Sequence, residues 1–327
     1  MLSNLLLILF ALTAPPRLHG IVVTPYSEAP ERGLTFDGMI DEIAETGASH
    51  VSIVVQWSQA SVTSNLIAPH PKETQDETVI RRMIRRARAA GLKVVVFPII
   101  WVEKRGPGMW RGTLRPENTG LWWTSYRTFI LHTAQLARDE GAAVFSVGSE
   151  LGSMEAQEGR WRGLIAEVRS QFRGQLLYSA NWDHFEHVSF WDAVDLVGLT
   201  AYHRLTTRPP PARPDLDELR ASWARIRLVV VDFSQRIGRP VVFTEVGYPS
   251  QASAAHRPWD YAAGSAPDLA LQADCYRAFA ETWRDEAALS GVFFWNWWGV
   301  GGAFDADYTP RGKPALEHLR GLFMPKP

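Results

Sequence analysis

Two glutamates, Glu150 and Glu245, each follow a run of apolar and small residues with the composition of a buried strand. The runs are Val144-Phe-Ser-Val-Gly-Ser before Glu150 and Pro240-Val-Val-Phe-Thr before Glu245. A carboxylate is costly to bury because it loses its hydration. For either residue alone, a side chain that simply emerges into solvent is an equal alternative. The repeated pattern favours a carboxylate pair, the minimum that cleavage of a glycosidic bond requires.

Tryptophan is unusually frequent, with 14 residues in a chain of 327. Aromatic faces stack on the apolar faces of sugar rings as they do on other polarised partners. Core packing is the alternative, and it suits the tryptophans that fall in helical patterns, which are Trp161, Trp223 and Trp283. Others fall at the ends of strand-like runs or in the following loops, and these are Trp57, Trp101, Trp110, Trp182, Trp295, Trp297 and Trp298.

Eight strand-like runs alternate with amphipathic helical patterns along the chain. The runs are 21–26, 51–57, 93–101, 144–150, 176–182, 194–202, 240–245 and 291–298. Strict alternation requires parallel strands. Eight such units in roughly 300 residues predict an α/β fold, a single (β/α)₈ TIM barrel over residues 20–327. An open doubly wound sheet is the alternative.

A barrel would bring the two glutamates together. All parallel strands end at one face, where active sites of this architecture are built. Glu150 ends the fourth run and Glu245 the seventh. We therefore expect the two carboxylates to face each other across a tryptophan-lined mouth.

Three motifs carry a resemblance to a known group of enzymes, and they are Val147-Gly-Ser-Glu-Leu151, Thr244-Glu-Val-Gly-Tyr248 and Phe294-Trp-Asn-Trp-Trp298. They resemble the retaining glycosidase clan built on (β/α)₈ barrels, clan A, and within it most closely the family 113 β-mannanases. The resemblance extends over nearly the whole chain from Gly20. It implies that Glu150 is the general acid/base and Glu245 the nucleophile of a double displacement, with carboxyl groups about 5–5.5 Å apart.

The resemblance also implies substrate-binding residues. Ser149 stands where many clan members have an asparagine that binds the sugar 2-hydroxyl, so this chain departs from the clan's pattern at that contact. Tyr202 matches a tyrosine that hydrogen-bonds the nucleophile, with a rim aromatic as the alternative. Trp295 or Trp297 is expected to floor the cleavage subsite, and strand alternation places both on one face. Further candidates at the mouth, each with packing as an alternative, are Asn181, Trp57, Trp101 and Trp182.

Other classes of function find little support. The net charge of −1 does not favour binding to nucleic acid or anionic membranes. No phosphate-binding loop, Rossmann fingerprint or nucleophile elbow is present, and His184-Phe-Glu-His187 lacks the order of a zinc helix. We therefore expect no cofactor and no metal. Cys275, the single cysteine, is predicted to be a small core residue.

Residues 5–12 form an apolar run that is too short to span a membrane and is typical of a secretory signal. Residues 1–19 are thus predicted to be a signal peptide or an N-terminal arm, with a secreted or periplasmic protein that has no stable membrane association once processed. The n-region lacks Lys and Arg, which weakens this prediction. Nothing in the sequence indicates an oligomeric state.

These observations predict a retaining glycoside hydrolase acting on a β-linked polysaccharide or oligosaccharide, with β-1,4-mannan as the first expectation. The same machinery acting on a β-glucan or β-galactan is one alternative. A carbohydrate-binding barrel without activity is another, although the presence of both glutamates argues against it.

Overall fold

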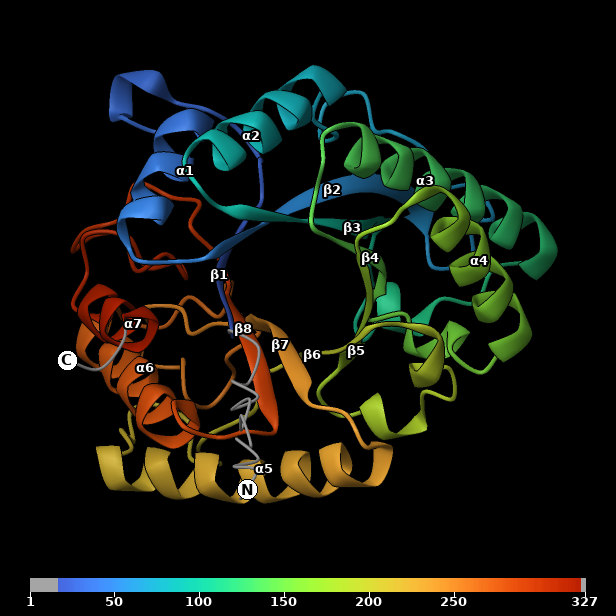
Figure 1. Ribbon diagram of the computed structural model, residues 1–327. Helices are drawn as coiled ribbons and strands as arrows, with labels where there is room; N and C mark the ends of the chain where they lie inside the picture. The colour runs from blue at the N-terminus through green and yellow to red at the C-terminus, as the bar shows by residue number, and fades with distance from the viewer. Residues whose placement is uncertain (1–16, 325–327) are drawn as a thin grey trace, which may run out of the picture.

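The computed structural model describes residues 17–324 and shows eight parallel strands closed into a barrel (Figure 1). The strands are β1 (Leu18–Val23), β2 (His50–Ser61), β3 (Lys93–Lys104), β4 (Val144–Ser149), β5 (Gln175–Asn181), β6 (Leu196–Thr200), β7 (Val241–Val246) and β8 (Leu289–Phe294). Because β1 pairs with β8, the sheet has no open edge. The predicted (β/α)₈ architecture is confirmed, and the open doubly wound sheet is excluded.

Within residues 17–324 seven α-helices surround the barrel. In Figure 1 the helices form the outer ring of coiled ribbons. They are α1 (Phe36–Glu45), α2 (Glu77–Ala89), α3 (Thr119–Asp139), α4 (Glu158–Gln171), α5 (Leu216–Ile237), α6 (Leu269–Trp283) and α7 (Ala315–Phe323). Several begin at a side chain that caps free backbone N–H groups. Thr35 accepts from Gly38 N at the start of α1, and Asp215 accepts from Glu218 N at the start of α5.

Two layers of apolar side chains hold the barrel together. Along β1, Val22 points into the barrel while Ile21 and Val23 point outward to the helices, as the two-residue period of a strand requires. The interior cluster consists of Val22, Val54, Val95, Phe97, Ile99, Val144, Leu177, Val242 and Phe293. A much larger outer layer joins the strands to the helices and includes Cys275, as predicted. The rigid barrel therefore presents the strand ends as a fixed platform.

Three boundaries differ from the sequence expectation. Strand β8 ends at Phe294 rather than Trp298, so the prediction that Trp295 and Trp297 share one strand face is wrong. Between β5 and β6 the chain forms two 3-10 turns, η4 (Phe185–His187) and η5 (Trp191–Ala193), in place of an α-helix. Strand β1 starts at Leu18, two residues before the expected start of the barrel, and the apolar run 5–12 lies outside the described residues.

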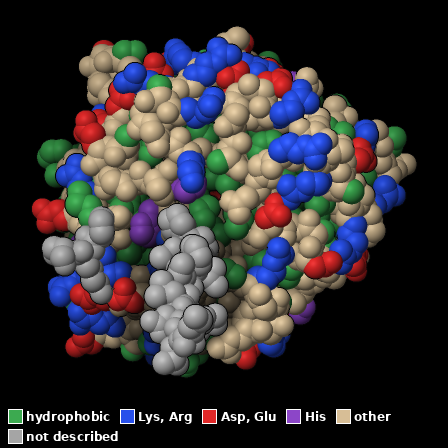
Figure 2. Space-filling model, viewed as in Figure 1, with side chains coloured by type: hydrophobic (Ala, Val, Ile, Leu, Met, Phe, Trp, Pro, Cys, Tyr) green, Lys and Arg blue, Asp and Glu red, His purple; other side chains and the backbone are tan. Residues whose placement is uncertain are grey.

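The arginine-rich face of α2 is a surface network of ion pairs. Arg81 and Arg85 both pair with Glu140, and Arg86 pairs with Asp41. In Figure 2 blue and red side chains alternate along the upper edge, where α2 lies. Such interleaved charges of both signs are typical of a solvated helix surface. Within residues 17–324 no helix has the length and apolar character that crossing a membrane requires.

Candidate active site

Both strands that lead to the candidate glutamates contain one extra residue just before the carboxylate. Between β4 and β5 the register runs from Ser146 opposite Leu177 to Ser149 opposite Ser179. Between β6 and β7 it runs from Leu199 opposite Phe243 to Thr200 opposite Glu245. Such bulges bend a strand and redirect the side chains that follow. The sequence places the glutamates at the strand ends, and the bulges orient them.

Glu150 has an unusual backbone and two strong partners. Among residues 17–324 it is the one residue other than glycine with a positive φ, at 55°. This conformation costs on the order of 1–2 kcal/mol and persists where the surroundings hold it. Its N–H donates to the carbonyl of Ser179 at 2.8 Å. Thr200 Oγ1 donates to its Oε1 at 2.7 Å, and Arg111 Nη2 pairs with its Oε2.

Glu245 is more deeply buried and has fewer partners. Its side chain is 1% exposed. Tyr202 Oη donates to Glu245 Oε2 at 3.0 Å, so the hydrogen bond implied by the family resemblance is present. The other carboxylate oxygen, Oε1, is buried without a hydrogen-bond partner. An unpartnered oxygen at the base of the mouth is available to attack an electrophile.

Arg111 interacts electrostatically with both carboxylates. It comes from the 3-10 turn η2 (Arg111–Thr113), which follows β3. Although burial opposes it, the charges of Glu150 and Glu245 raise the pKa of Arg111. Burial, and next the charge of Glu150, raise the pKa of Glu245 to about 8, against the opposing effects of Arg111 and Tyr202. The pair therefore holds a proton that ordinary glutamates release near pH 4.5, as coupled carboxyl groups do.

A purely structural ion pair is the alternative explanation for Glu150 and Arg111. The Arg111 side chain is 23% exposed, so it lies between solvent and the buried carboxylate of Glu150. Its Nε is nevertheless buried without a partner, and it lies in reach of the charges of both glutamates. A pair serving stability alone would not need a second buried carboxylate beside it, because that second charge is a net cost.

Aromatic side chains surround the carboxylates. Tyr308 lies 6.2 Å from the Tyr202 ring, and the charge of Glu245 contributes to raising its pKa, after the effect of burial. Trp295 packs against the interior cluster and remains partly exposed. It lies directly beside Gly247, where a Cβ would come within 2.6 Å of the Trp295 carbonyl oxygen. The segment after β7 therefore requires glycine there for the chain to approach Trp295, whose N–H donates to the Val246 carbonyl at 2.8 Å.

A second aromatic surface lies at the rim formed by the loops after β5, β6 and β7. Trp182 and Trp259 stack with ring centroids 6.1 Å apart, and Trp259 is 41% exposed. The guanidinium of Arg204 lies over the Trp259 ring at 5.7 Å. Trp101 is also partly exposed, and it contacts His70 edge-on. We call Trp182 and Trp259 the rim wall.

Two of the proposed sugar-binding tryptophans make packing contacts instead. Trp57 stacks on Phe129 of α3 at 4.9 Å, on the outer side of the barrel. Trp297 is 2% exposed, and its indole N–H donates to Glu42 of α1 at 2.9 Å. The sequence left packing open for Trp57, but the end of β8 at Phe294 was needed to separate Trp297 from Trp295.

The remaining predicted residues lie close to Glu150. The Ser149 hydroxyl is buried and has no hydrogen-bond partner. Asn181 Oδ1 lies 3.2 Å from Thr200 Oγ1, so Thr200 links Asn181 to the carboxylate of Glu150. Asn181 Nδ2 donates to Asp183 at 2.7 Å.

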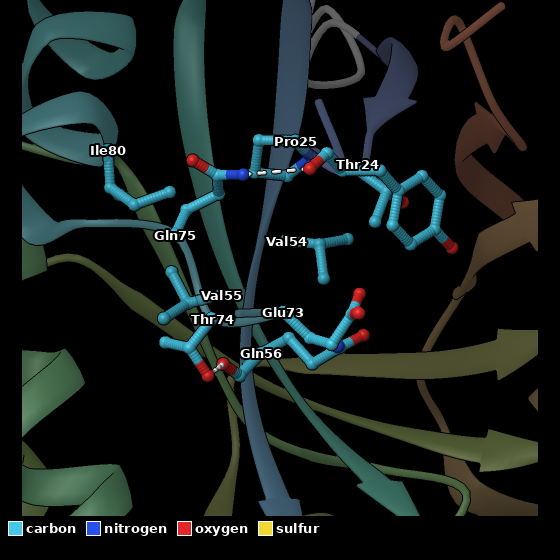
Figure 3. Close-up of a pocket in the computed structure, with 10 residues that line it drawn as sticks. Thr24, Pro25, Val54, Val55, Gln56, Glu73, Thr74, Gln75 and Ile80 are labelled. Carbon is cyan, nitrogen blue, oxygen red and sulfur yellow. Dashed lines mark hydrogen bonds between the residues drawn. The ribbon is translucent and has the colours of Figure 1, made fainter. Parts of the chain in front are cut away.

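Beside the mouth, a shallow solvent-open hollow lies between the ends of β1 and β2 and the loop before α2 (Figure 3). Hydrogen bonds from Gln75 to the Tyr26 carbonyl and from Thr74 to the Gln56 carbonyl close its sides. Tyr26, which lines this hollow, contacts Trp298 edge-on with ring centroids 5.3 Å apart. Within the described residues no three His, Cys, Asp or Glu side chains are grouped to hold a metal ion.

Sequence reasoning missed two residues that contact Glu150. Arg111 lies in the loop after β3, and its reach into the mouth depends on a loop conformation that short-range patterns do not encode. Thr200 has a detectable signal, because it lies two residues before Tyr202 in the same strand-like run. Alternation along a strand would have placed both on the side that faces the mouth.

Comparisons with known proteins agree with this geometry. The family model described as Glycoside Hydrolase Family 113 matches residues 35–305. A β-mannanase of that family from Alicyclobacillus acidocaldarius, solved in complex with ManMIm, is 28% identical with a TM-score of 0.82, covering 94% of this chain and 97% of that one. No curated protein matches the chain.

Two further solved structures, a GH113 β-1,4-mannanase on its own and in a complex, are 24% and 23% identical. Each has a TM-score of 0.81 and covers 95% of this chain and 100% of its own. At these identities they show the shared fold alone. The family match covers most of the chain, from α1 through β8. The chain belongs to Glycoside Hydrolase Family 113, and the protein is a glycosidase.

Proposed function

We propose that this glycosidase cleaves β-1,4-linked mannan or manno-oligosaccharides with retention of configuration. One observation carries the mechanism: two buried carboxylates from the ends of β4 and β7 interact with one guanidinium at the barrel mouth. The choice of mannan is supported by the similarity to the solved GH113 β-mannanases.

In the first step Glu245 Oε1 attacks the anomeric carbon and forms a glycosyl ester, while the bond from that carbon to the glycosidic oxygen breaks. Glu150 gives its proton to the departing oxygen. In the second step Glu150 takes a proton from water, whose oxygen bonds to the anomeric carbon and releases Glu245. Glu150 is then protonated again and the cycle closes.

Arg111 has a role in the resting state. Glu150 cannot donate a proton while its carboxylate is held by the guanidinium, so the ion pair opens when a substrate enters the mouth. The neighbouring Glu245 must then lose the proton that burial favours. A guanidinium that remains near Glu245 assists this ionisation, because it opposes the rise in the pKa of that residue.

Polar groups beside Glu150 are proposed to bind the substrate. The free Ser149 hydroxyl and Asn181 lie beside Glu150 and are placed to meet sugar hydroxyls. Trp295 is proposed as the floor of the cleavage subsite. Trp101 and Trp182 are proposed to contact the sugars on either side, with Trp182 acting through the rim wall.

The direct test compares release of reducing ends from soluble β-mannan, β-glucan and β-galactan by the wild type and by Glu245→Ala. We expect activity on mannan that the substitution abolishes. Activity confined to glucan or galactan would replace the proposed substrate and keep the mechanism. Binding of the polysaccharide without release of reducing ends would favour the non-catalytic alternative.

We also propose that the protein is exported through its apolar segment 5–12, on the sequence pattern alone. The mass of the mature protein from a secreting host tests this. A chain that starts at Met1 and stays inside the cell would contradict it.

A further inference from the structure

A buried hydrogen-bond chain leads from the protein surface to the backbone next to Glu150. His184 Nδ1 lies 2.6 Å from Glu155 Oε2, and Tyr178 Oη lies 2.6 Å from Glu155 Oε1. Leu151 N–H donates to Tyr178 Oη at 3.3 Å. His184 is thus a partner of a buried carboxylate, outside any zinc site of the His184-Phe-Glu-His187 stretch. We call His184, Glu155 and Tyr178 the relay.

The direction of each hydrogen bond follows from the groups involved. Burial raises the pKa of the Tyr178 hydroxyl well above its ordinary value, so Tyr178 keeps its proton and donates it to Glu155. Its oxygen lone pair is then free to accept from Leu151. Burial raises the pKa of Glu155, and the hydrogen bonds that it accepts from Tyr178 and His184 oppose this rise. With Glu155 ionised, His184 donates through Nδ1–H.

The relay acts on the one strained residue of the site. The peptide before Glu150 is fixed by Ser179, and the peptide after it is fixed by Tyr178, both on β5. Together they hold the positive φ of Glu150. If the second anchor is lost, the backbone is free to relax toward ordinary values, and the carboxyl group moves away from its productive position.

A buried Glu155 is difficult to explain by packing. It is 2% exposed, and a charged side chain at such a place is costly unless it serves a specific arrangement. The Tyr178 ring is already held by Trp161 and Phe190 at 5.0 and 5.1 Å, so packing does not need its hydroxyl. The polar atoms of the relay are therefore in excess of what the core requires.

We propose that His184, Glu155 and Tyr178 are positioning residues for the acid/base Glu150, acting through the 150–151 peptide. This rests on the proposed role of Glu150. Displacement of an acid by a fraction of an ångström slows proton transfer to the leaving group, but it affects less those reactions that need no proton. The relay therefore predicts a defect that depends on the leaving group.

The experiment measures kcat/KM for two aryl β-mannobiosides, one with a 2,4-dinitrophenyl group and one with an unsubstituted phenyl group. The corresponding cellobiosides are used if the wild type prefers them. For His184→Ala and Tyr178→Phe we expect about tenfold loss on the phenyl substrate and less than twofold on the dinitrophenyl substrate. His184→Asn keeps an N–H donor near the Nδ1 position and is expected to stay within about twofold of wild type on both.

Tyr126→Phe is the matched control. Tyr126 is also buried, and its hydroxyl donates to the Val147 carbonyl of β4 at 2.7 Å, but it does not touch the 150–151 peptide. We expect no change in the ratio of the two rates. Because His184 lies at the surface, with its side chain 41% exposed, His184→Ala is expected to fold even if Tyr178→Phe does not.

Equal slowing of both substrates by the relay variants, or the same change of ratio in Tyr126→Phe, overturns the proposal in favour of general packing. Glu150→Gln distinguishes a failure of the proposed role of Glu150 from a failure of the relay. If it shows no dependence on the leaving group, the role of Glu150 fails and the relay fails with it. If Glu150→Gln shows the dependence and the relay variants do not, the relay alone is wrong.

Discussion

The ends of β4 and β7 place the same side chain in two different environments. In Glu150 one carboxylate oxygen accepts a hydrogen bond from Thr200 and the other pairs with Arg111. The backbone of Glu150 is held in a left-handed conformation. Glu245 has a single tyrosine donor and one bare oxygen. Both follow a bulge in their strands, so the difference arises from their neighbours, which are Arg111 and Thr200 for Glu150 and Tyr202 for Glu245. Chemically identical residues are thereby prepared for different roles.

The largest expected effect comes from replacing the carboxylate of Glu245, whose Oε1 has no hydrogen-bond partner. Glu245→Gln preserves shape but cannot form a glycosyl ester, so kcat should fall by about 10⁴-fold or more on every substrate, whatever the leaving group. The measurement is steady-state hydrolysis of soluble mannan and of aryl mannosides. Retention of more than a hundredth of wild-type activity would remove Glu245 from the nucleophile's role.

Glu150→Gln should give a smaller and selective loss. An acid contributes about 10²–10⁴-fold where the leaving group needs a proton. The phenyl substrate should therefore lose at least about a hundredfold, while the first step on the dinitrophenyl substrate is nearly unchanged. Pre-steady-state kinetics separates that step from the second, which also needs Glu150 as a base. A uniform loss in the first step would make the two carboxylates equivalent.

Arg111→Gln tests the charge that the two carboxylates share. Since Arg111 lowers the pKa of Glu245, its removal should raise that pKa further. The ionised nucleophile then appears at higher pH, and the acid limb of the pH profile of kcat/KM should move in the alkaline direction. Lys in place of Arg should restore part of the shift. A limb that does not move, or that moves toward acid, would show that the guanidinium does not act on Glu245.

The smallest expected effect concerns stability, and its sign is opposite to that for activity. Glu245 titrates at about 8 in the fold and near 4.5 in the unfolded chain, so the folded state holds a proton that the unfolded state has lost between these pH values. Its contribution to stability therefore falls as pH rises from about 4.5 to 8. Glu245→Gln removes this penalty and should stabilise the protein at pH 7 by on the order of 2 kcal/mol.

Thermal unfolding at pH 5 and pH 8 measures this effect. The gain in Tm from Glu245→Gln should be larger at pH 8. A lower Tm than wild type at pH 8 would mean that the ionised carboxylate is well accommodated. Tyr276→Phe serves as a control, because the buried Tyr276 hydroxyl has no hydrogen-bond partner and lies on α6.

The sequence predicts the residues at the strand ends better than the contacts made by the loops. The barrel and the places of Glu150, Glu245 and Tyr202 followed from periodicity, strand count and family resemblance, because these depend on the regular pattern of a closed sheet. The positions of Arg111 and Glu155 depend on two short turns, η2 and η3 (Gly152–Met154), whose side-chain contacts come from distant parts of the chain. Local pattern carries no information about such contacts.

The tryptophans show the same limit. Trp295 and Trp297 are two residues apart, and a strand would have placed them on one face. Because β8 ends at Phe294, one lies by the mouth and the other bonds to Glu42 of α1. The position where a strand stops is set by its neighbours in the sheet, so the sequence alone does not separate the two residues.

The most direct test of the whole account is to trap the covalent intermediate. The enzyme is treated with 2-deoxy-2-fluoro-β-mannosyl fluoride, digested with protease, and the labelled peptide is sequenced by mass spectrometry. The account predicts one added sugar on Glu245 and none on Glu150, with reactivation when the excess reagent is removed. A label on Glu150, or an active enzyme that gives no label and releases product of inverted configuration, would contradict it.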